Sequence, residues 1–506
     1  MLGLDAADCD VVLNLIDRGH LPNLSHLMNN GVFGRLSTPA AHYAGGVWPS
    51  FYTGQSVPWH GIFHNKLWRP EAMRVEVPTD AWLEARPFWE SLGAAGIDVC
   101  VVDVPMVLGQ PRPVNGTYIA GWGTHDLICK GSWPTGLWHD LERQFGPPRM
   151  PREYFGQQSS SSLSRLTQQL LDTTDQLRDI SIELLGNNPW QFACVVLGAV
   201  HRAGHYLWDL SQVEDREHKK QDITALRSAM TEIYKNADSA IGRIIDGLTE
   251  NTLVVVFAVH GMGPNPGWSD LLPDILEKIE TYRTGKSQKR GLLYSIKQRV
   301  PYHWVRPVLT RLPGAMTDRL VSIWSKRMFN WSKTQFFPMP MDEAGYLRVN
   351  LRGRERGGIV NPGAEYDEVC LQIETLIAGL REEETGAPIA GNIVMAYQEA
   401  DPAAPCRDLI PDLIVPWHGP TATESTRLVN DELPGFVYEV PHPLPSGRPG
   451  NHTDKAWFIA HGPGVPSASL DEEHSILDLL PTILQHLGVI PGKGLQGRAI
   501  RLDARG

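Results

Sequence analysis

The sequence predicts an α/β protein whose centre is a mostly parallel β-sheet flanked by helices. Two apolar runs, Phe192-Ala-Cys-Val-Val-Leu197 and Leu253-Val-Val-Val-Phe257, have the length and composition of buried parallel strands, and amphipathic helical patterns lie between such runs. Each of the two runs is followed by a turn that carries histidine. Because open α/β sheets bind their ligands at the carboxyl ends of the strands, we expect a site in these turns.

Length and composition limit the class of protein. A chain of 506 residues exceeds one simple core, so we expect a large domain with insertions. The net charge of −11 argues against nucleic acid as the main partner. Six cysteines lie far apart without a CxxC pair, which indicates reduced thiols. With no secretory signal and no apolar run long enough to span a bilayer, the sequence predicts a cytoplasmic protein without a transmembrane segment.

The remaining elements follow from periodicity and turn signals. The opening Leu2-Gly-Leu-Asp5 is typical of a short strand that stops on a carboxylate. Further strands are expected at 96–104, 345–351, 392–397, 411–415 and 456–460, and helices at 8–30, 159–186, 236–248, 365–380 and 475–484.

A basic segment interrupts this pattern. Between Arg283 and Lys333 the chain holds twelve Lys or Arg and one acid, Asp318, interleaved with aromatic residues. We expect residues 276–339 to form an inserted cap on an α/β core made of residues 1–275 and 340–506. The segment is either a local positive field that attracts anionic substrates or the solvated basic face of a helical cap.

Histidines follow both of the clearest strands. In His201-Arg-Ala-Gly-His205, two imidazoles four residues apart would share one face of a helix and could hold one cation between them. Two histidines that are merely packed or solvated on a helical turn give the same spacing. His260, which precedes Gly-Met-Gly, is difficult to explain by core packing alone.

A pair of glycines, Gly45 and Gly46, offers a second kind of binding feature. Their backbone could come close to a ligand, and a helix starting near Val47 would point its free N–H groups at an anion. An ordinary glycine-rich loop has the same pattern.

Taken together, six motifs resemble those of the alkaline phosphatase superfamily in their order and spacing, and the branch they most resemble is that of the type I phosphodiesterases and nucleotide pyrophosphatases. The motifs are Gly3-Leu-Asp5, Trp48-Pro-Ser-Phe-Tyr-Thr-Gly54 with His60-Gly-Ile62, His201-x-x-x-His205, His260-Gly-Met-Gly263, Gly450-Asn-His452 and Ile476-Leu-Asp-Leu-Leu-Pro-Thr482. The resemblance covers most of the chain except the basic insertion.

The resemblance implies two zinc ions at the carboxyl edge of the sheet. Carried over position by position, the first metal falls to His201, His205 and His452, and the second to Asp5 and His260. His201 stands where the family has Asp, and a neutral ring nitrogen can still bind zinc. We therefore expect one strong zinc site with three histidine ligands and an open fourth position.

Two other positions depart from the family pattern. Val259 replaces the carboxylate that precedes His260, and Ala44, four residues before Trp48, stands at the position of the family's Ser or Thr nucleophile. Ala44 is explained either by an engineered change or by native loss of covalent catalysis, and Val259 favours native divergence. We expect the second metal to be weakly held or absent, and manganese is an alternative to zinc.

The resemblance thus implies a metal-dependent, phosphodiesterase-like hydrolase of phosphate esters. Zinc at the three-histidine site would activate water, and the turn with Gly45 and Gly46 would hold the anionic group of a small substrate that bears phosphate or sulfate. A catalytically impaired or repurposed binding protein and a group transferase are the alternative interpretations. Substrate identity, oligomeric state and the role of the basic insertion are left open by the sequence.

Overall fold

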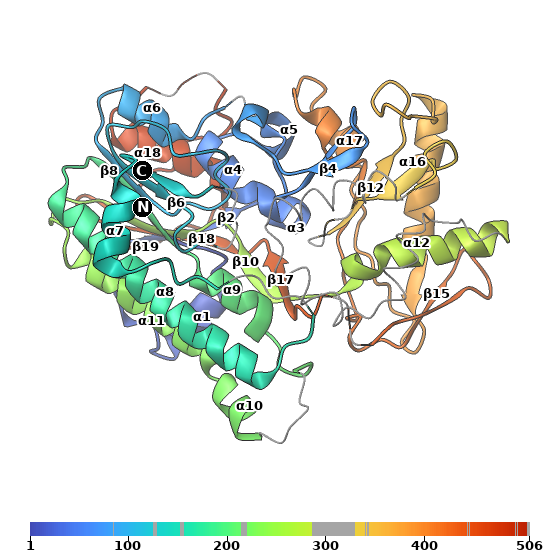
Figure 1. Ribbon diagram of the computed structural model, residues 1–506, viewed down its shortest axis with the longest axis horizontal. Helices are drawn as coiled ribbons and strands as arrows, with labels where there is room; N and C mark the ends of the chain where they lie inside the picture. The colour runs from blue at the N-terminus through green and yellow to red at the C-terminus, as the bar shows by residue number, and fades with distance from the viewer. Residues whose placement is uncertain are drawn as a thin grey trace.

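The chain folds into two units that lie side by side, a larger one built on a central sheet and a smaller one at the right of Figure 1. The computed structural model describes residues 1–502 apart from 84, 125–128, 152–155, 214–219, 286–328, 340, 342–343, 443, 445, 491 and 493. Within these residues no helix is long and apolar enough to cross a membrane.

The central sheet contains ten strands within the described part of the chain. Their order is β19 (Ala468–Ser469), β2 (Val32–Ser37), β18 (Ala456–His461), β9 (Val254–Ala258), β1 (Leu2–Leu4), β8 (Phe192–Leu197), β5 (Val99–Val102), β6 (Gly116–Ala120) and β7 (Gly131–Trp133), and β20 (His474–Ser475) pairs with β2. The strands from β9 to β6 run parallel, whereas β18 is antiparallel to both of its neighbours, β2 and β9. The mostly parallel sheet predicted from the sequence is confirmed.

Helices cover both faces of this sheet, as Figure 1 shows. One face packs against α1 (Cys9–Asp17), α2 (Pro22–Asn29), α7 (Leu137–Phe145), α8 (Ser160–Asn187), α9 (Ala199–Leu207) and α11 (Ala229–Ile245). The other face packs against α4 (Val47–Thr53), α5 (Val57–His60), α6 (Phe88–Ala94) and α18 (Leu479–His486). Successive strand residues serve opposite faces, since Val254 and Val256 belong to the first core and Val255 and Phe257 to the second.

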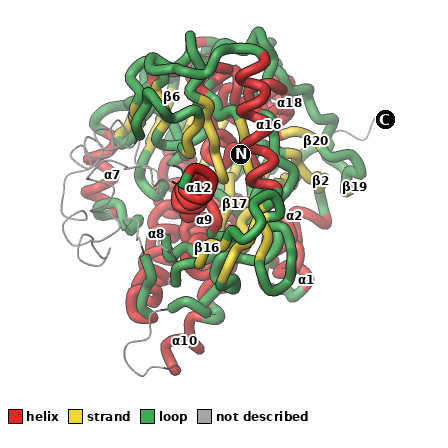
Figure 2. Tube along the Cα trace, turned by 90° about the vertical axis from the view of Figure 1, so that its right-hand side faces the viewer, coloured by secondary structure: helices red, strands yellow, loops and turns green. Residues whose placement is uncertain are grey.

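The smaller unit has a hydrophobic core of its own, which extends from Trp268 to Leu444. Its helices are α12 (Trp268–Thr284), α16 (Ala364–Ala378) and α17 (Ala396–Glu399). One small sheet contains β11 (Phe336–Pro338), β12 (Gly345–Val349) and β14 (Leu413–Val415). The other contains β13 (Leu380–Glu382), β15 (Arg427–Asn430) and β16 (Val437–Glu439). Figure 2 places α12 and α16 nearest the viewer, in front of α9 and β17.

Short elements connect these parts. A hairpin of β3 (Leu67–Arg69) and β4 (Arg74–Glu76) and a ribbon of β10 (Gly261–Pro264) and β17 (Gly450–Thr453) lie outside the central sheet. The remaining short helices are α3 (Ala40–Tyr43), η1 (Ala44–Gly46), η2 (Asp80–Trp82), α10 (Lys220–Leu226), η3 (Arg407–Leu409) and η4 (Ile476–Asp478).

Two expected elements differ from the structure. The helix expected at 8–30 is two helices, because the chain turns at Gly19, whose φ of 72° is left-handed, and restarts with Pro22 in the first turn of α2. The strand expected at 392–397 was wrong. Only Val394 forms an isolated bridge, with Ile414, and the helical turn α17 begins at Ala396.

The predicted division of the chain is not decided by these elements. Most of the expected cap at 276–339, Asp318 included, lies outside the described residues. The described residues on either side of that gap contribute to the core that extends from Trp268 to Leu444, which is wider than the expected cap. The boundaries at 275 and 340 therefore stay predictions.

Candidate metal centre

The topology gathers the expected ligands at one edge of the central sheet. Asp5 follows β1 directly, His260 follows β9, and α9 follows β8, so three parallel strands end at this edge. β18 runs the opposite way, which brings the preceding β17 and its His452 to the same edge. Figure 1 shows α9, β10 and β17 together at the centre of the molecule, where the two units meet.

Close backbone packing fixes the distance between α9 and β17. A Cβ added to Gly450 would lie 2.0 Å from the carbonyl oxygen of Gly204, and one added to Gly204 would lie 2.4 Å from Met262. Only glycine therefore allows β17 to approach the helix this closely. The result is a hydrogen bond of 3.0 Å from His205 Nδ1 to the Gly450 carbonyl oxygen.

The helical spacing predicted for His201 and His205 is confirmed, since both lie on α9 and are buried. Their Nε2 atoms are 3.1 Å apart, and His452 Nε2 is 2.9 Å from His201 Nε2. The ring centroid of His205 lies 4.9 Å from those of His201 and His452. His201 Nε2 thus contacts the Nε2 atoms of both other expected ligands of the first metal.

The hydrogen bonds at the far side of these rings determine where their protons lie. Asp5 Oδ2 is 2.6 Å from His201 Nδ1, and a carboxylate oxygen accepts the proton that Nδ1 donates. The Gly450 carbonyl likewise accepts from His205 Nδ1. Neutral His201 and His205 therefore present lone pairs at Nε2, the atoms that face each other.

A single proton cannot serve this arrangement. A proton on His201 Nε2 bridges either to His205 or to His452, and the other contact then joins two nitrogens without a hydrogen between them. One divalent cation satisfies all three nitrogens at once. Tetrahedral zinc with Zn–N bonds of about 2.0–2.1 Å places its nitrogen ligands about 3.3 Å apart, so His201 Nε2 would lie only a few tenths of an ångström farther from its two neighbours than it does here. The donor set fits zinc.

A fourth imidazole borders the same cluster. Ring nitrogens of His201, His260 and His452 all lie within 4.8 Å of one another. His260 is buried, and its Nδ1 and that of His452 have no hydrogen-bond partner. Burial lowers the pKa of His260 to about 4 despite the nearby Asp5 carboxylate, so the ring is neutral at physiological pH.

Asp5 is fully buried and already has two donors. Trp48 Nε1 donates to Oδ1 over 2.8 Å, and His201 Nδ1 donates to Oδ2. Burial alone would raise the pKa of Asp5, but the charge and hydrogen bond of His201, with smaller contributions from His260 and Trp48, lower it below its usual value. His260 Nε2, the other expected ligand of the second metal, is 3.9 Å from Asp5 Oδ1.

The two departures from the family pattern are both buried. Val259 is part of the hydrophobic core between the sheet and α4, and Ala44 begins η1, directly before α4. α3, which immediately precedes Ala44, contacts β17 of the candidate metal centre. Neither residue offers an atom that binds metal or attacks an ester.

Gly45 and Gly46 are small for a reason other than the expected one. A Cβ on Gly45 would lie 2.6 Å from the carbonyl oxygen of Phe63, and one on Gly46 would lie 2.7 Å from Val57. The helix expected near Val47 is present as α4, but the N–H of Val47 already bonds to the Ala44 carbonyl oxygen. The turn therefore packs closely against the chain at 57–64.

Sequence reasoning missed two groups of the site. The Trp48 indole and the Gly450 carbonyl orient Asp5 and His205, yet neither was predicted to do so. Gly3 carried a signal for Trp48, because a Cβ there would lie 3.2 Å from the indole ring, a tight contact that glycine avoids. His60, part of a family motif, has a structural role, with Nε2 3.0 Å from Ser50 Oγ and Nδ1 accepting from the Ile62 N–H.

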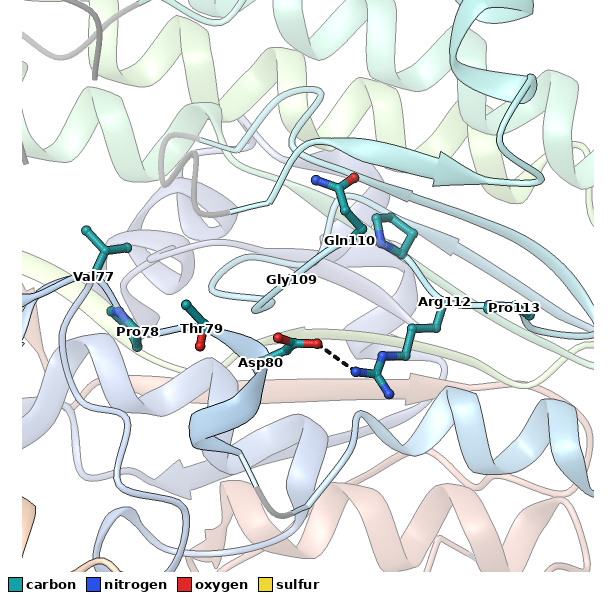
Figure 3. Close-up of a pocket in the computed structure, with 9 residues that line it drawn as sticks. Val77, Pro78, Thr79, Asp80, Gly109, Gln110, Arg112 and Pro113 are labelled. Atoms are coloured by element: carbon teal, nitrogen blue, oxygen red, sulfur yellow. Dashed lines mark hydrogen bonds and ion pairs between the residues drawn. The ribbon is translucent and has the colours of Figure 1, made fainter. Parts of the chain in front are cut away.

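A hollow of about 600 Å³ lies elsewhere on the larger unit (Figure 3). Arg112 and Asp80 face each other across it at 2.6 Å, so the cation there is already neutralised. None of the expected site residues lines it. Its lining residues are Val77, Pro78, Thr79, Asp80, Gly109, Gln110, Pro111, Arg112 and Pro113.

The sequence of residues 1–418 matches the family described as type I phosphodiesterase / nucleotide pyrophosphatase. The chain belongs to this family. By the activities in that description it is a phosphoester hydrolase, and the resemblance inferred from the six motifs is confirmed. A search among curated proteins finds no match.

Solved structures share the fold. The alkaline phosphatase PafA superposes with a TM-score of 0.55 at 12% identity, covering 99% of this chain and 98% of that chain. An inactive form of murine ectonucleotide pyrophosphatase/phosphodiesterase 5 in complex with AMP gives 0.49 at 14% identity, covering 98% and 96%. Phosphonoacetate hydrolase from Sinorhizobium meliloti 1021 with phosphonoformate gives 0.47 at 12% identity, covering 94% and 92%. The likeness to PafA confirms the alkaline-phosphatase-like fold.

Proposed function

We propose that this chain is a zinc-dependent, phosphodiesterase-like hydrolase of phosphate esters that works with one metal ion, held by His201, His205 and His452. The observation that supports this proposal most directly is the convergence of three Nε2 atoms, at 2.9 and 3.1 Å, whose lone pairs no single proton can satisfy. Three imidazoles of which two are buried would bind zinc and leave a fourth position open to water or substrate.

The roles of the residues follow from their contacts. A zinc ion bound here would supply Lewis acidity, lowering the pKa of a bound water from about 15.7 to about 7. Asp5 and the Gly450 carbonyl hold the rings of His201 and His205 with Nε2 inward. Ala44 has no hydroxyl, so no covalent intermediate forms at that position and the attacking group comes from water. The turn that contains Gly45 and Gly46 is our proposed contact for the anionic group.

A second metal would be weakly held or absent. Both oxygens of Asp5 already accept hydrogen bonds, and Val259 supplies no ligand. This leaves His260 with a single nearby carboxylate at 3.9 Å. Manganese is the alternative occupant of the first site, although a set of nitrogen ligands favours zinc.

The substrate is proposed to be a small molecule that bears phosphate or sulfate, and the compartment the cytoplasm. All six cysteines are free, five of them buried, which agrees with a reducing environment. The net charge of −11 makes nucleic acid an unsuitable main partner.

The test combines metal analysis with turnover. The purified chain should bind one equivalent of zinc and cleave nitrophenyl phosphate mono- or diesters, or the corresponding sulfate, when zinc or manganese is added. His205→Ala should lose the metal and the activity together. His139→Ala is the matched control, since this imidazole is 79% exposed on α7 and pairs only with Glu142 within its own helix. Full activity without bound metal would disprove the proposal.

A metal-binding protein without turnover is the second candidate, favoured by the apolar Val259 and the missing hydroxyl at Ala44. One equivalent of zinc with no cleavage of any of these esters would support it. A group transferase would instead release nitrophenol faster when an alcohol acceptor is added, and phosphate would appear on that alcohol.

A further inference from the structure

Asp5 stands at a metal-ligand position of its family, but its contacts here indicate a different task. We propose that Asp5 is a positioning residue that fixes the tautomer of His201, keeping the proton on Nδ1 and the lone pair of Nε2 directed at the metal. This inference rests on the metal site of the proposed function, and it concerns this chain's own hydrogen bonds.

The first support is the chain of hydrogen bonds itself. Trp48 Nε1 donates to Asp5 Oδ1 at 2.8 Å, and His201 Nδ1 donates to Asp5 Oδ2 at 2.6 Å. Asp5 and Trp48 are 0% and 2% exposed, so water does not substitute for either partner. A carboxylate that accepts from the far nitrogen of a ligating imidazole orients the ring and increases its basicity.

The second support is the direction of each donor. An indole N–H can only donate, so the atom of residue 5 that faces Trp48 must be an acceptor. The other atom faces His201 Nδ1. In the native chain both atoms are carboxylate oxygens, and Nδ1 must carry the proton. Trp48 therefore fixes the orientation of Asp5 in the same way that Asp5 fixes His201.

In Asp5→Asn this geometry allows only one orientation of the side-chain amide. The amide oxygen must face Trp48, because an NH₂ group there would oppose another donor. The NH₂ group then faces His201 Nδ1, which has to accept, and the ring proton moves to Nε2. A protonated Nε2 cannot ligate a metal. Asp5→Asn, a nearly isosteric change, thus moves the ring proton of His201 from Nδ1 to Nε2, the atom that would bind metal. Asp5→Ala leaves the tautomer of His201 unconstrained.

Trp48→Phe provides the rescue. Phenylalanine keeps an aromatic ring against Phe257 and Phe51 but has no donor. In the double variant with Asp5→Asn the amide can turn its oxygen to His201 Nδ1, which restores the native tautomer. A role of Asp5 in stability alone predicts no such rescue, because the second change would only add to the damage.

The experiment measures zinc affinity of the full chain by competition with a chelator, without substrate. Asp5→Asn should weaken affinity by about 10- to 100-fold, the usual cost of removing such a partner. Trp48→Phe alone provides the reference affinity, and the double variant should recover most of the loss caused by Asp5→Asn. Asp238→Asn is the control, since this buried carboxylate accepts from Asn23 and Leu24 on α2 and touches no imidazole. It should lower the melting temperature and leave zinc affinity unchanged.

A second readout needs no metal. In the metal-free chain labelled with ¹⁵N-histidine, His201 should show the Nδ1–H tautomer, and Asp5→Asn should shift it to Nε2–H. Native zinc affinity in Asp5→Asn, or a double variant as weak as Asp5→Asn, would overturn the proposal. So would the loss of one of two bound metals with the other unaffected, because Asp5 would then be a ligand. If the zinc affinities and the tautomer shift follow this prediction but no ester is cleaved, the proposed hydrolase activity is refuted and the proposed role of Asp5 is retained.

Discussion

Two polar clusters of this molecule differ in how many of their polar atoms find a hydrogen-bond or charge partner within the cluster. The charge network of the smaller unit consists of Arg348, Arg354, Glu355 and Asp412, so its two positive and two negative charges balance. Arg354 makes two bonds to Asp412, at 2.8 and 2.6 Å, and Arg348 donates to Glu355 at 2.6 Å. The imidazole cluster of His201, His205, His260 and His452 has the opposite character.

Nitrogens in the imidazole cluster face nitrogens, and two buried Nδ1 atoms have no partner. Buried polar groups are normally paired, and unpaired ones cost free energy. The comparison teaches that burial of polar side chains does not by itself indicate a site. A cluster that closes on itself stabilises the fold, whereas a cluster that needs one more positive charge indicates a ligand.

The sharpest way to break this comparison is to truncate one imidazole. His452→Ala should weaken zinc binding about a thousandfold, because one of three ligands is lost from a site whose binding free energy is of order 10 kcal/mol or more. The stability of the metal-free chain should change less than zinc affinity, since His452 Nδ1 has no partner and Nε2 faces only another imidazole nitrogen. Chelator competition and urea unfolding measure the two quantities. A large loss of stability in the metal-free chain with unchanged zinc affinity would show that the imidazole cluster stabilises the fold and does not bind the metal.

Truncation in the charge network should give the reverse result. Asp412→Ala leaves Arg354 buried with half of its partners, and we expect a loss of about 3–5 kcal/mol in the free energy of unfolding. Zinc affinity of the folded chain should be unchanged. Asp431→Ala, which removes the half-exposed partner of Arg381, is the control and should cost less than about 1 kcal/mol. Equal losses of unfolding free energy in Asp412→Ala and Asp431→Ala would show that the buried charge network contributes no more to stability than an exposed ion pair.

A backbone change tests whether the imidazoles depend on the approach of β17 to α9. Gly450→Ala places a methyl group against the Gly204 carbonyl and should push β17 outward. We expect zinc affinity to fall about tenfold, with a loss of about 1–3 kcal/mol in stability from overpacking. Gly136→Ala is the matched control, since an added Cβ there meets nothing within 4 Å. Native zinc affinity in Gly450→Ala would show that the close approach is not needed.

The last prediction concerns the pH dependence of stability at His60, a buried histidine that is fully paired. Burial lowers its pKa to about 3, so the unfolded chain takes up a proton below about pH 6.5 while the folded chain does not until about pH 3. Stability is therefore lost as pH falls through this window, by up to about 1.4 kcal/mol per pH unit. His60→Asn keeps an acceptor for the Ile62 N–H and should flatten this slope in unfolding experiments. An unchanged acid slope would show that other groups dominate.

Much of the site could be predicted because its ligands come in a fixed order after strands. The apolar runs before His201 and His260 identify parallel strands, and parallel strands end at one edge, so convergence follows from topology. His452 was located by resemblance alone, since β17 is a short ribbon with no strong strand pattern.

The orientation of side chains could not be predicted in the same way. Asp5 was expected to bind metal, but its contacts depend on the position of Trp48, which is set by packing over Gly3 and against Phe257. Gly45 and Gly46 were expected to approach a ligand, and the sequence pattern did not indicate that they also pack against the chain at 62–64. The charge network could not be predicted, because the sequence pattern of Arg348 and Glu355 is that of solvated residues, whereas both are buried in the smaller unit.

The position of β18 has a consequence for how the chain is made. This strand is inserted between β2 and β9, although it follows them by hundreds of residues in the sequence. During synthesis the sheet stays open between those two strands until residue 461 has left the ribosome, with two apolar strand edges exposed meanwhile. His452 immediately precedes β18, so the strand that separates β2 from β9 and the third expected ligand are made together. A metal ion held by His201, His205 and His452, as proposed, would therefore gain its last ligand only once this late strand has been made.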